Sequence, residues 1–186
     1  MKNILTYRGI TPSIHDSAFI ASTAIVSGDV VIGKDVGIWY GVIIRGDVAK
    51  IRIGDGTNIQ DNSVVHVTRP NHAQNKTGDE GGPTIIGKGV TIGHNAIIHA
   101  CIIEDYAFIG MGSIVMDLAR VESFGMLAAG AVLTPGKVVK SGQIWAGNPA
   151  RYFRDLTEEE KDYIKISELN YIDLAREYKE IEEEKS

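Results

Sequence analysis

Residues 86–103 read IGKGVTIGHNAIIHACII, and their spacing indicates the kind of fold. An aliphatic residue recurs every six positions, at Ile86, Ile92 and Ile98, and after a shortened interval again at Ile103. A period of six fits neither the 3.6-residue repeat of a helix nor the simple alternation of a hairpin strand. It fits short strands joined by tight corners, in which one aliphatic side chain per unit points inward and stacks on its equivalents. The stretch therefore predicts a parallel β-solenoid.

The same spacing extends over most of the chain. Further inward residues are Ile20, Val26, Ile32, Ile38, Ile44, Ile53, Ile59 and Val65 before this stretch, and Ile109, Val115, Val121, Leu127, Leu133 and Val139 after it. Together these eighteen units resemble the hexapeptide-repeat family, which implies a left-handed parallel β-helix of triangular section with three units per coil. We therefore expect an all-β solenoid of about six coils. The alternative, a β-sandwich, needs turn signals roughly every 8–12 residues.

The rest of the chain is expected to form a loop and a terminal helix. We place the β-helix domain at residues 1–150, with a polar, glycine-rich loop at 67–83 where the repeat is interrupted. Residues 151–186 are assigned to a C-terminal helix packed on the prism. Its start is signalled by a capping box, in which Thr157 is followed three positions later by Glu160.

Composition excludes several classes of function. The net charge is −5 and no basic stripe occurs, so nucleic acid is not expected as a partner. No run approaches the roughly 18 apolar residues of a membrane span, and the N-terminus shows no secretory signal. The one cysteine, Cys101, fits a reducing compartment and is read as a small buried residue. A cytoplasmic location is the resulting expectation.

Three histidines can be placed relative to one another by the repeat. His66 and His99 each directly follow an inward residue, and three units separate them, so they should lie on one face, one coil apart. Arg45 extends this column. His94 falls on the next face, where Asp61, preceded by Gln60, holds the equivalent position one coil away.

A single prism cannot bring His94 to the other two histidines across its edge. A trimer of prisms packed side by side can, which predicts three metal sites between subunits. Three neutral imidazoles without a thiolate are typical of catalytic zinc, which lowers the pKa of bound water to about 7. Zinc is therefore the expected metal, with iron or cobalt as alternatives. His15 is interpreted as structural and His72 as solvated, with a proton-relay role as the alternative for His72.

At these residues the chain resembles the γ-class carbonic anhydrases, in their short, loop-reduced branch. The motifs that carry the resemblance are Arg45-Gly46-Asp47, Asn58-Ile59-Gln60-Asp61-Asn62, Val65-His66 and Gly93-His94-Asn95-Ala96-Ile97-Ile98-His99. The resemblance implies a homotrimer in which His66 and His99 of one subunit and His94 of the next bind the metal.

The resemblance also assigns roles around the metal. It implies that Gln60 orients the hydroxide, that Arg45 pairs with Asp47 and Asp61 across the interface, and that Tyr171 of the tail helix lies near the site. The implied activity is that of a metal-dependent lyase, the reversible hydration of CO2 to bicarbonate. Archetypal members carry a proton-exporting Glu where this chain has Val48, which predicts a low turnover. Asp79 and Glu80 in the loop are candidate replacements.

Two other readings stay open. A hexapeptide acyltransferase, or a thioesterase using the same metal chemistry, would act on an acyl-coenzyme A. A non-catalytic metal-binding trimer would use the histidines to hold its subunits together.

Overall fold

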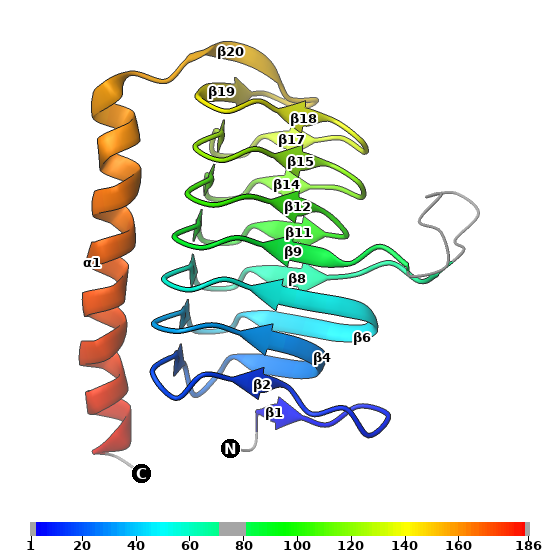
Figure 1. Ribbon diagram of the computed structural model, residues 1–186, viewed down its shortest axis with the longest axis vertical. Helices are drawn as coiled ribbons and strands as arrows, with labels where there is room; N and C mark the ends of the chain where they lie inside the picture. Colours follow the sequence, from blue (N-terminus) through cyan, green and yellow to red (C-terminus); the bar gives the residue numbers. More distant parts are fainter. Residues whose placement is uncertain (1–2, 71–80, 185–186) are drawn as a thin grey trace.

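Short parallel strands stack into a prism with one long helix along its side (Figure 1). The computed structural model describes residues 3–70 and 81–184. Over these residues the chain forms a left-handed parallel β-helix of about seven turns followed by a single helix, which confirms the expected fold class. Each turn contributes one strand to each of three walls.

The first wall holds the strands that carry His66 and His99. Its members are β1 (Ile4–Leu5), the first halves of β4 (Ile25–Ile32) and β6 (Ile43–Ile53), then β8 (Val64–His66), β11 (Ile97–His99), β14 (Ile114–Val115) and β17 (Val132–Leu133). All neighbours on this wall pair in parallel, so equivalent positions of successive turns lie directly above one another.

The second and third walls follow the same scheme. The second wall is made of β2 (Ser13–Ile14), the second halves of β4 and β6, β9 (Thr84–Ile86), β12 (Ile102–Ile103), β15 (Arg120–Val121) and β18 (Val138–Val139). The third wall is made of β3 (Phe19–Ile20), β5 (Gly37–Ile38), β7 (Asn58–Ile59), β10 (Thr91–Ile92), β13 (Phe108–Ile109), β16 (Met126–Leu127) and β19 (Gln143–Ala146).

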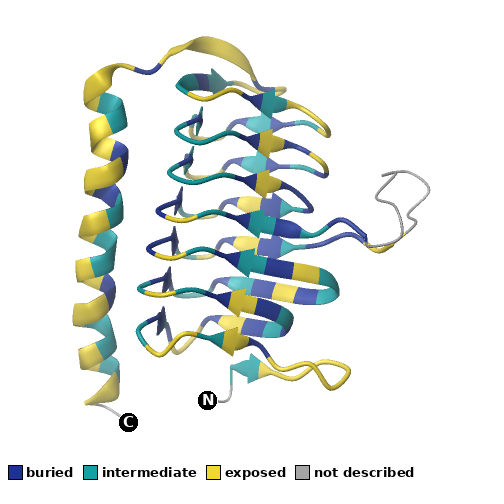
Figure 2. Cartoon of the chain, in the orientation of Figure 1, coloured by how far each residue is buried: buried dark blue, intermediate teal, exposed yellow. Residues whose placement is uncertain are grey.

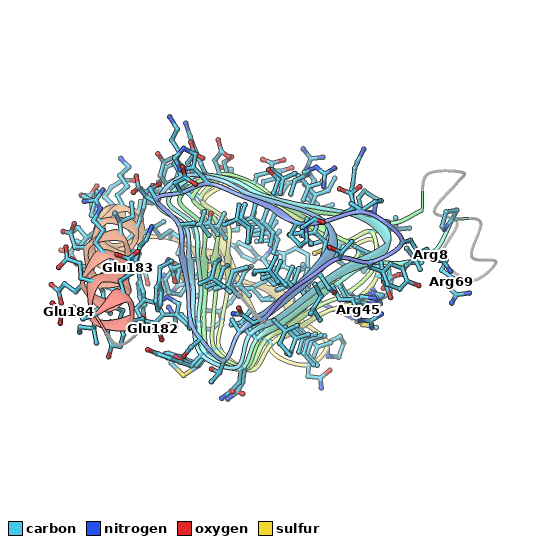
Figure 3. The ribbon with its side chains drawn as sticks, turned by 90° about the horizontal axis from the view of Figure 1, so that it is seen from below. Arg8, Arg45, Arg69, Glu182, Glu183 and Glu184 are labelled. Atoms are coloured by element: carbon cyan, nitrogen blue, oxygen red, sulfur yellow. The ribbon has the colours of Figure 1, made fainter. Side chains whose placement is uncertain are left out.

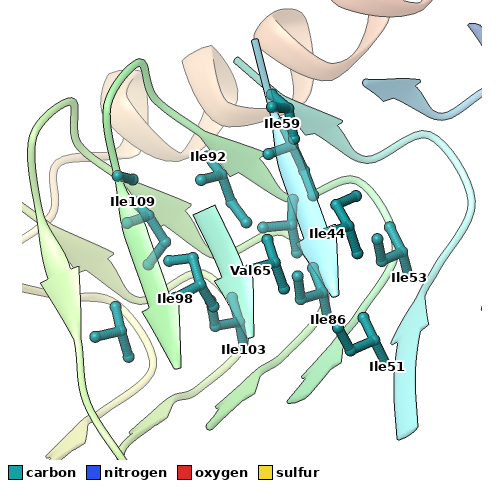
Figure 4. Close-up of a cluster of buried hydrophobic side chains, with 14 of the residues drawn as sticks. Ile44, Ile51, Ile53, Ile59, Val65, Ile86, Ile92, Ile98, Ile103 and Ile109 are labelled. Atoms are coloured by element: carbon teal, nitrogen blue, oxygen red, sulfur yellow. The ribbon is translucent and has the colours of Figure 1, made fainter. Parts of the chain in front are cut away.

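Inward aliphatic side chains fill the prism (Figure 4). Ile44, Val65 and Ile98 of the first wall are fully buried, as are Ile92 and Ile109 of the third. Removing this apolar surface from water at about 25 cal/mol per Å² is the main favourable term for a fold whose single turns cannot bury it alone. Figure 2 shows the resulting alternation of buried and exposed residues along the strands.

The expected number of coils was one too low. Three inward positions lie outside the expected units: Ile4 and Ile14 before them, on strands that pair with β4, and Trp145 after them on β19. Ile14 and Trp145 continue the six-residue spacing, whereas Ile4 lies ten positions before Ile14.

Every departure from the six-residue spacing falls at one corner, between the first and second walls. The inward residues are nine positions apart from Ile44 to Ile53, and 21 apart from Val65 to Ile86. They are only five apart from Ile98 to Ile103. We call this edge the variable corner. From Ile14 to Trp145, inward positions separated by the other two corners are always six residues apart.

The third wall is covered by the C-terminal helix. β20 (Arg151–Asp155) first pairs antiparallel with β19, so part of the segment expected to be helical is a strand. Helix α1 (Glu158–Glu183) then starts at the predicted capping box of Thr157 and Glu160. The division into domains 1–150 and 151–186 remains a prediction. None of the helices described is both long enough and apolar enough to cross a membrane.

Candidate metal centre

His66 and His99 meet on the outer surface of the first wall, beside the variable corner. They end β8 and β11 and are direct partners in the parallel register of these strands. The Nδ1 atom of His66 lies 3.3 Å from the Nε2 atom of His99. The predicted pairing of the two imidazoles on one face, one turn apart, is therefore confirmed.

In each ring, the nitrogen that points away from the other imidazole is hydrogen-bonded to a carboxylate. The His66 Nε2 atom lies 3.0 Å from Asp47 Oδ1, and the His99 Nδ1 atom lies 2.7 Å from Asp117 Oδ1. If each neutral ring donates its N–H to its carboxylate, two lone pairs face each other across the 3.3 Å gap. Such an arrangement needs a cation or a proton between the rings.

The gap has the size that a metal requires. Two nitrogens bound at 2.0–2.1 Å to a tetrahedral zinc ion are about 3.3 Å apart. Carboxylates that fix the outer N–H groups of histidine ligands are the usual surroundings of such a site. The donor set and its spacing therefore fit a divalent metal bound through His66 Nδ1 and His99 Nε2.

Asp47 belongs to an insertion of the variable corner. Burial acts to raise the pKa of its carboxyl, but hydrogen bonds from His66 and Arg45 together hold that pKa below its usual value. The pKa of His66 is lowered, chiefly by burial and against the effect of Asp47, which favours the neutral ring that binds metal. Arg45 forms an ion pair with Asp47 of its own chain, and its expected pairing across the interface remains a prediction.

His94 and Asp61 form the second column, at the corner between the third and first walls. The His94 Nδ1 atom lies 2.8 Å from Asp61 Oδ2, which leaves Nε2 for another partner. Asn95 follows at φ 58°, a left-handed conformation that asparagine tolerates well, and its N–H donates to the Asp61 carbonyl. Within the chain, Asp61 thus contacts His94, and its expected contact with Arg45 of another subunit remains a prediction.

Gln60 is held in place beneath the helix. Its side-chain Nε2 donates to Asn58 Oδ1 at 3.1 Å, and Asn58 in turn donates to Thr91 Oγ1 at 3.0 Å. Because the amide nitrogen is used internally, the Gln60 carbonyl oxygen is left as the group able to accept a hydrogen bond.

Tyr171 of α1 packs over the third wall, close to this second column. Its ring meets that of Trp39 edge-on, with centroids 5.8 Å apart. Burial raises the pKa of the Tyr171 phenol, and the negative charge of Asp61 adds to that rise. The structure therefore brings Tyr171 near Asp61 of its own chain.

Sequence reasoning missed Asp117 and Thr68. The Thr68 hydroxyl donates to Asp117 Oδ2 at 2.6 Å, and the other carboxylate oxygen of Asp117 contacts His99. The sequence did hold a signal for Asp117. The unit between Ile98 and Ile103 is one residue short, and Asp117, two positions after Val115, lies in the next turn above it.

The remaining candidates have these surroundings. Cys101 is buried, as expected, and burial raises the pKa of its thiol. His15 contacts Ser17 in the first turn. Val48 lines a cavity of about 560 Å³ at the variable corner. His72, Asp79 and Glu80 lie outside the described residues.

No group of three His, Cys, Asp or Glu side chains suited to a metal forms within residues 3–70 and 81–184 of one chain. His66 and His99 come together, and His94 lies on the other column with Asp61.

Comparison with known proteins gives a consistent set of relatives. The chain is 48% identical over 165 residues to gamma carbonic anhydrase 1, mitochondrial, of Arabidopsis thaliana, with 89% of this chain and 58% of that protein covered. It is 39% identical over 183 residues to a carbonic anhydrase of Geobacillus kaustophilus, with 98% of this chain and 94% of that protein covered. The chain thus spans little more than half the length of the plant relative.

A solved structure supports the same fold. The hexapeptide transferase family protein from Anaplasma phagocytophilum superposes with a TM-score of 0.87 at 52% identity, covering 96% of this chain and 99% of that one. No protein-family model matches the chain.

Proposed function

Because the chain belongs to the γ-carbonic anhydrase family of hexapeptide-repeat proteins, we propose that it catalyses the reversible hydration of CO2 to bicarbonate at metal sites between the subunits of a homotrimer. The observation that carries this proposal is the pair of imidazole nitrogens 3.3 Å apart, each ring being fixed by a carboxylate. His66 and His99 supply two ligands, and His94 of a neighbouring subunit supplies the third.

The outer surface of the first wall favours such a trimer. A column of aliphatic side chains points outward beside the two histidines and consists of Ile25, Ile43, Val64, Ile97, Ile114 and Val132. Ile97 is 42% exposed in the single chain, and continuous apolar stripes of this kind mark interaction surfaces. Packing this wall against the edge that carries His94 buries the stripe and completes the ligand set.

The chain's own residues then prepare the reaction. When bound, a cation held by three neutral imidazoles supplies the acidity that makes water a nucleophile near neutral pH. The side-chain carbonyl oxygen of Gln60 would orient that water by accepting a hydrogen bond from it. The ion pair of Arg45 with Asp47 keeps the His66 ring in place, while Asp61 does the same for His94. Tyr171 narrows the site from the helix side.

Zinc is the metal that this ligand set favours, and iron and cobalt are alternatives that imidazole ligands also accept. Each turnover must release one proton. With Val48 in place of the archetypal Glu, no carboxylate at that position takes it, so we propose a low turnover unless the loop carboxylates Asp79 and Glu80 substitute.

The test is the metal content per subunit measured together with stopped-flow CO2 hydration, after loading with zinc and, anaerobically, with iron. The proposal expects one metal per subunit and hydration that stops on chelation. Full metal content without hydration under either loading would exclude the lyase activity and leave a metal-binding trimer. Absence of metal would refute the three-histidine site itself.

One observation favours a second candidate function. The cavity at the variable corner exceeds what CO2 requires, and Arg8 and Arg69 line it next to Asp47, at the end of the prism's section away from the helix (Figure 3). Arginines recognise phosphate groups, such as those of an acyl-coenzyme A. Transfer of the acetyl group of acetyl-coenzyme A to an amine or hydroxyl acceptor, lost in Arg8→Gln and retained during chelation, would establish an acyltransferase instead. Hydrolysis of the thioester to acetate that is lost on chelation would indicate a metal-dependent thioesterase.

A further inference from the structure

Thr68, Asp117 and His99 form a hydrogen-bonded chain that ends at a proposed metal ligand. The Thr68 hydroxyl lies 2.6 Å from one oxygen of Asp117, and the other oxygen lies 2.7 Å from His99 Nδ1. Thr68 and Asp117 are only 6% and 9% exposed. Hydrogen bonds of a carboxylate in such surroundings are stronger than those between neutral groups in water.

This contact spans two turns of the prism. Thr68 belongs to the turn of Val65 and Asp117 to the turn of Val115, and the turn of Ile98 lies between them. Strands stack at about 4.8 Å, so residues two turns apart are normally roughly 10 Å away from each other.

The shortened corner of the intervening turn makes the contact possible. Between Ile98 and Ile103 the chain uses five positions in place of six, and Ala100 turns there at φ 45°. Ala100 and Cys101 have small side chains and are only 2% and 1% exposed, respectively. The corner that they form therefore lies closer to the prism axis than a six-residue corner would. Asp117 from above and Thr68 from below can then meet across it, beside His99.

The contact determines which nitrogen of His99 is available. By accepting the N–H at Nδ1, Asp117 leaves the lone pair on Nε2, the atom that faces His66 across 3.3 Å. Thr68 holds the second oxygen of Asp117 and so opposes rotation of the carboxylate. Thr68 itself is fixed at the base of the loop, where it exchanges two backbone hydrogen bonds with Gly82.

We propose that Asp117 is a positioning residue that sets the tautomer of His99, and that Thr68 holds Asp117, so that the base of the 67–83 loop sets part of the metal affinity of the site. The inference deepens the proposed function and rests on it for the metal. A purely structural role for the same residues would lower the stability of the protein without changing the His99 ring.

The test uses the full chain with Asp117→Asn, Thr68→Val and Thr68→Ser, and Asp173→Asn on the exposed side of α1 as the matched control. The tautomer of His99 is read from its imidazole ¹⁵N resonances in metal-free protein. Zinc affinity is measured by competition with a chromophoric chelator, and the melting temperature is measured without metal.

We expect Asp117→Asn to abolish the predominance of the Nδ1–H tautomer and to weaken zinc binding about 10- to 100-fold. Thr68→Val should weaken it about three- to tenfold through the loss of one hydrogen bond, and Thr68→Ser should restore most of that loss. Asp173→Asn should change neither quantity.

Two results would overturn the inference. One is a His99 ring that lacks the Nδ1–H tautomer in the unmodified protein or keeps it in Asp117→Asn. The other is a fall in affinity that only accompanies a lower melting temperature and that Thr68→Ser does not restore. If the unmodified protein binds no zinc, the metal proposal fails, and the tautomer measurement alone decides whether Asp117 positions His99.

Discussion

The variable corner and the other two corners of the prism share one backbone scheme but differ in regularity. At the other two, six-residue spacing holds from Ile14 to Trp145, whereas the variable corner takes nine, 21 and five positions in three successive turns. These same turns carry Asp47, Thr68 and His99, whose hydrogen bonds connect the histidine pair to its carboxylates. The variable corner thus brings the histidine pair to its carboxylates, while the regular corners preserve the stack, and one of them carries His94 with Asp61.

Substitutions of two neighbouring residues on β11 should separate the stability of the prism from the assembly of the site. Ile98→Ala leaves a cavity among fully buried side chains and should destabilise the protein by about 2–5 kcal/mol. Ile97→Ala, which removes a 42% exposed side chain of the outward column, should scarcely alter the stability of a subunit but should weaken the trimer. Urea unfolding and sedimentation measure the two effects, and equal destabilisation by both variants would contradict the division.

Inserting one glycine between Ala100 and Cys101 would make the shortened corner regular. The insertion should separate Asp117 from Thr68 and reduce zinc affinity about 10- to 100-fold, as loss of a carboxylate on a ligand histidine does. A glycine inserted between Gly130 and Ala131, at a regular corner away from the histidines, should instead displace a buried residue and cost about 1–3 kcal/mol of stability. Circular dichroism and zinc titration distinguish the two. Unchanged zinc affinity after the first insertion would show that the short corner is incidental.

A gain of function is expected from Val48→Glu. The new carboxylate would stand beside Asp47 at the variable corner and accept the proton that each turnover releases, raising kcat by about ten- to a hundredfold in weak buffer. Val48→Gln, which has the same shape without the base, should leave kcat unchanged. A rise in kcat that is equal for both variants, or absent for Glu, would reject proton release as the limiting step.

The smallest effect concerns the start of the helix on the opposite wall. Hydrogen bonds from Arg154 and from the Thr157 backbone hold the pKa of Glu160 at about 2, below its ordinary 4.5. Because the pKa is lowered in the folded state, the stabilisation is complete above pH 4.5 and is lost as the pH falls toward 2. Melting temperatures between pH 5 and 2 should therefore fall less in Glu160→Gln than in the unmodified chain, with CO2 hydration at neutral pH unaffected. Parallel curves would contradict the assignment.

The features that depend only on the six-residue period could be predicted from the sequence. Inward residues, the pairing of His66 with His99 and that of His94 with Asp61 follow from counting units, because parallel register places equivalent positions above each other. The capping box at Thr157 is a local signal and was equally readable.

What escaped prediction depends on irregular geometry. Ile4 was missed because ten positions separate it from Ile14, and β20 was missed because its antiparallel pairing with β19 departs from the parallel repeat. Asp117 and Thr68 are 49 positions apart and two turns apart. Their contact depends on how far the shortened corner at Ala100 and Cys101 lies toward the prism axis, and the spacing of residues alone does not give that position.

Mixed trimers test most directly whether the irregular corner of one subunit and the regular edge of the next share a site. His66→Ala and His94→Ala subunits, each expected to be inactive alone, are unfolded, mixed in equal amounts and refolded with zinc. In a ring of like interfaces, about one interface in four should then combine an intact His66–His99 pair with an intact His94. Recovery of about a quarter of the normal zinc content and CO2 hydration is therefore predicted. No recovery from mixed trimers, despite metal and activity in the unmodified protein, would contradict a site shared between subunits.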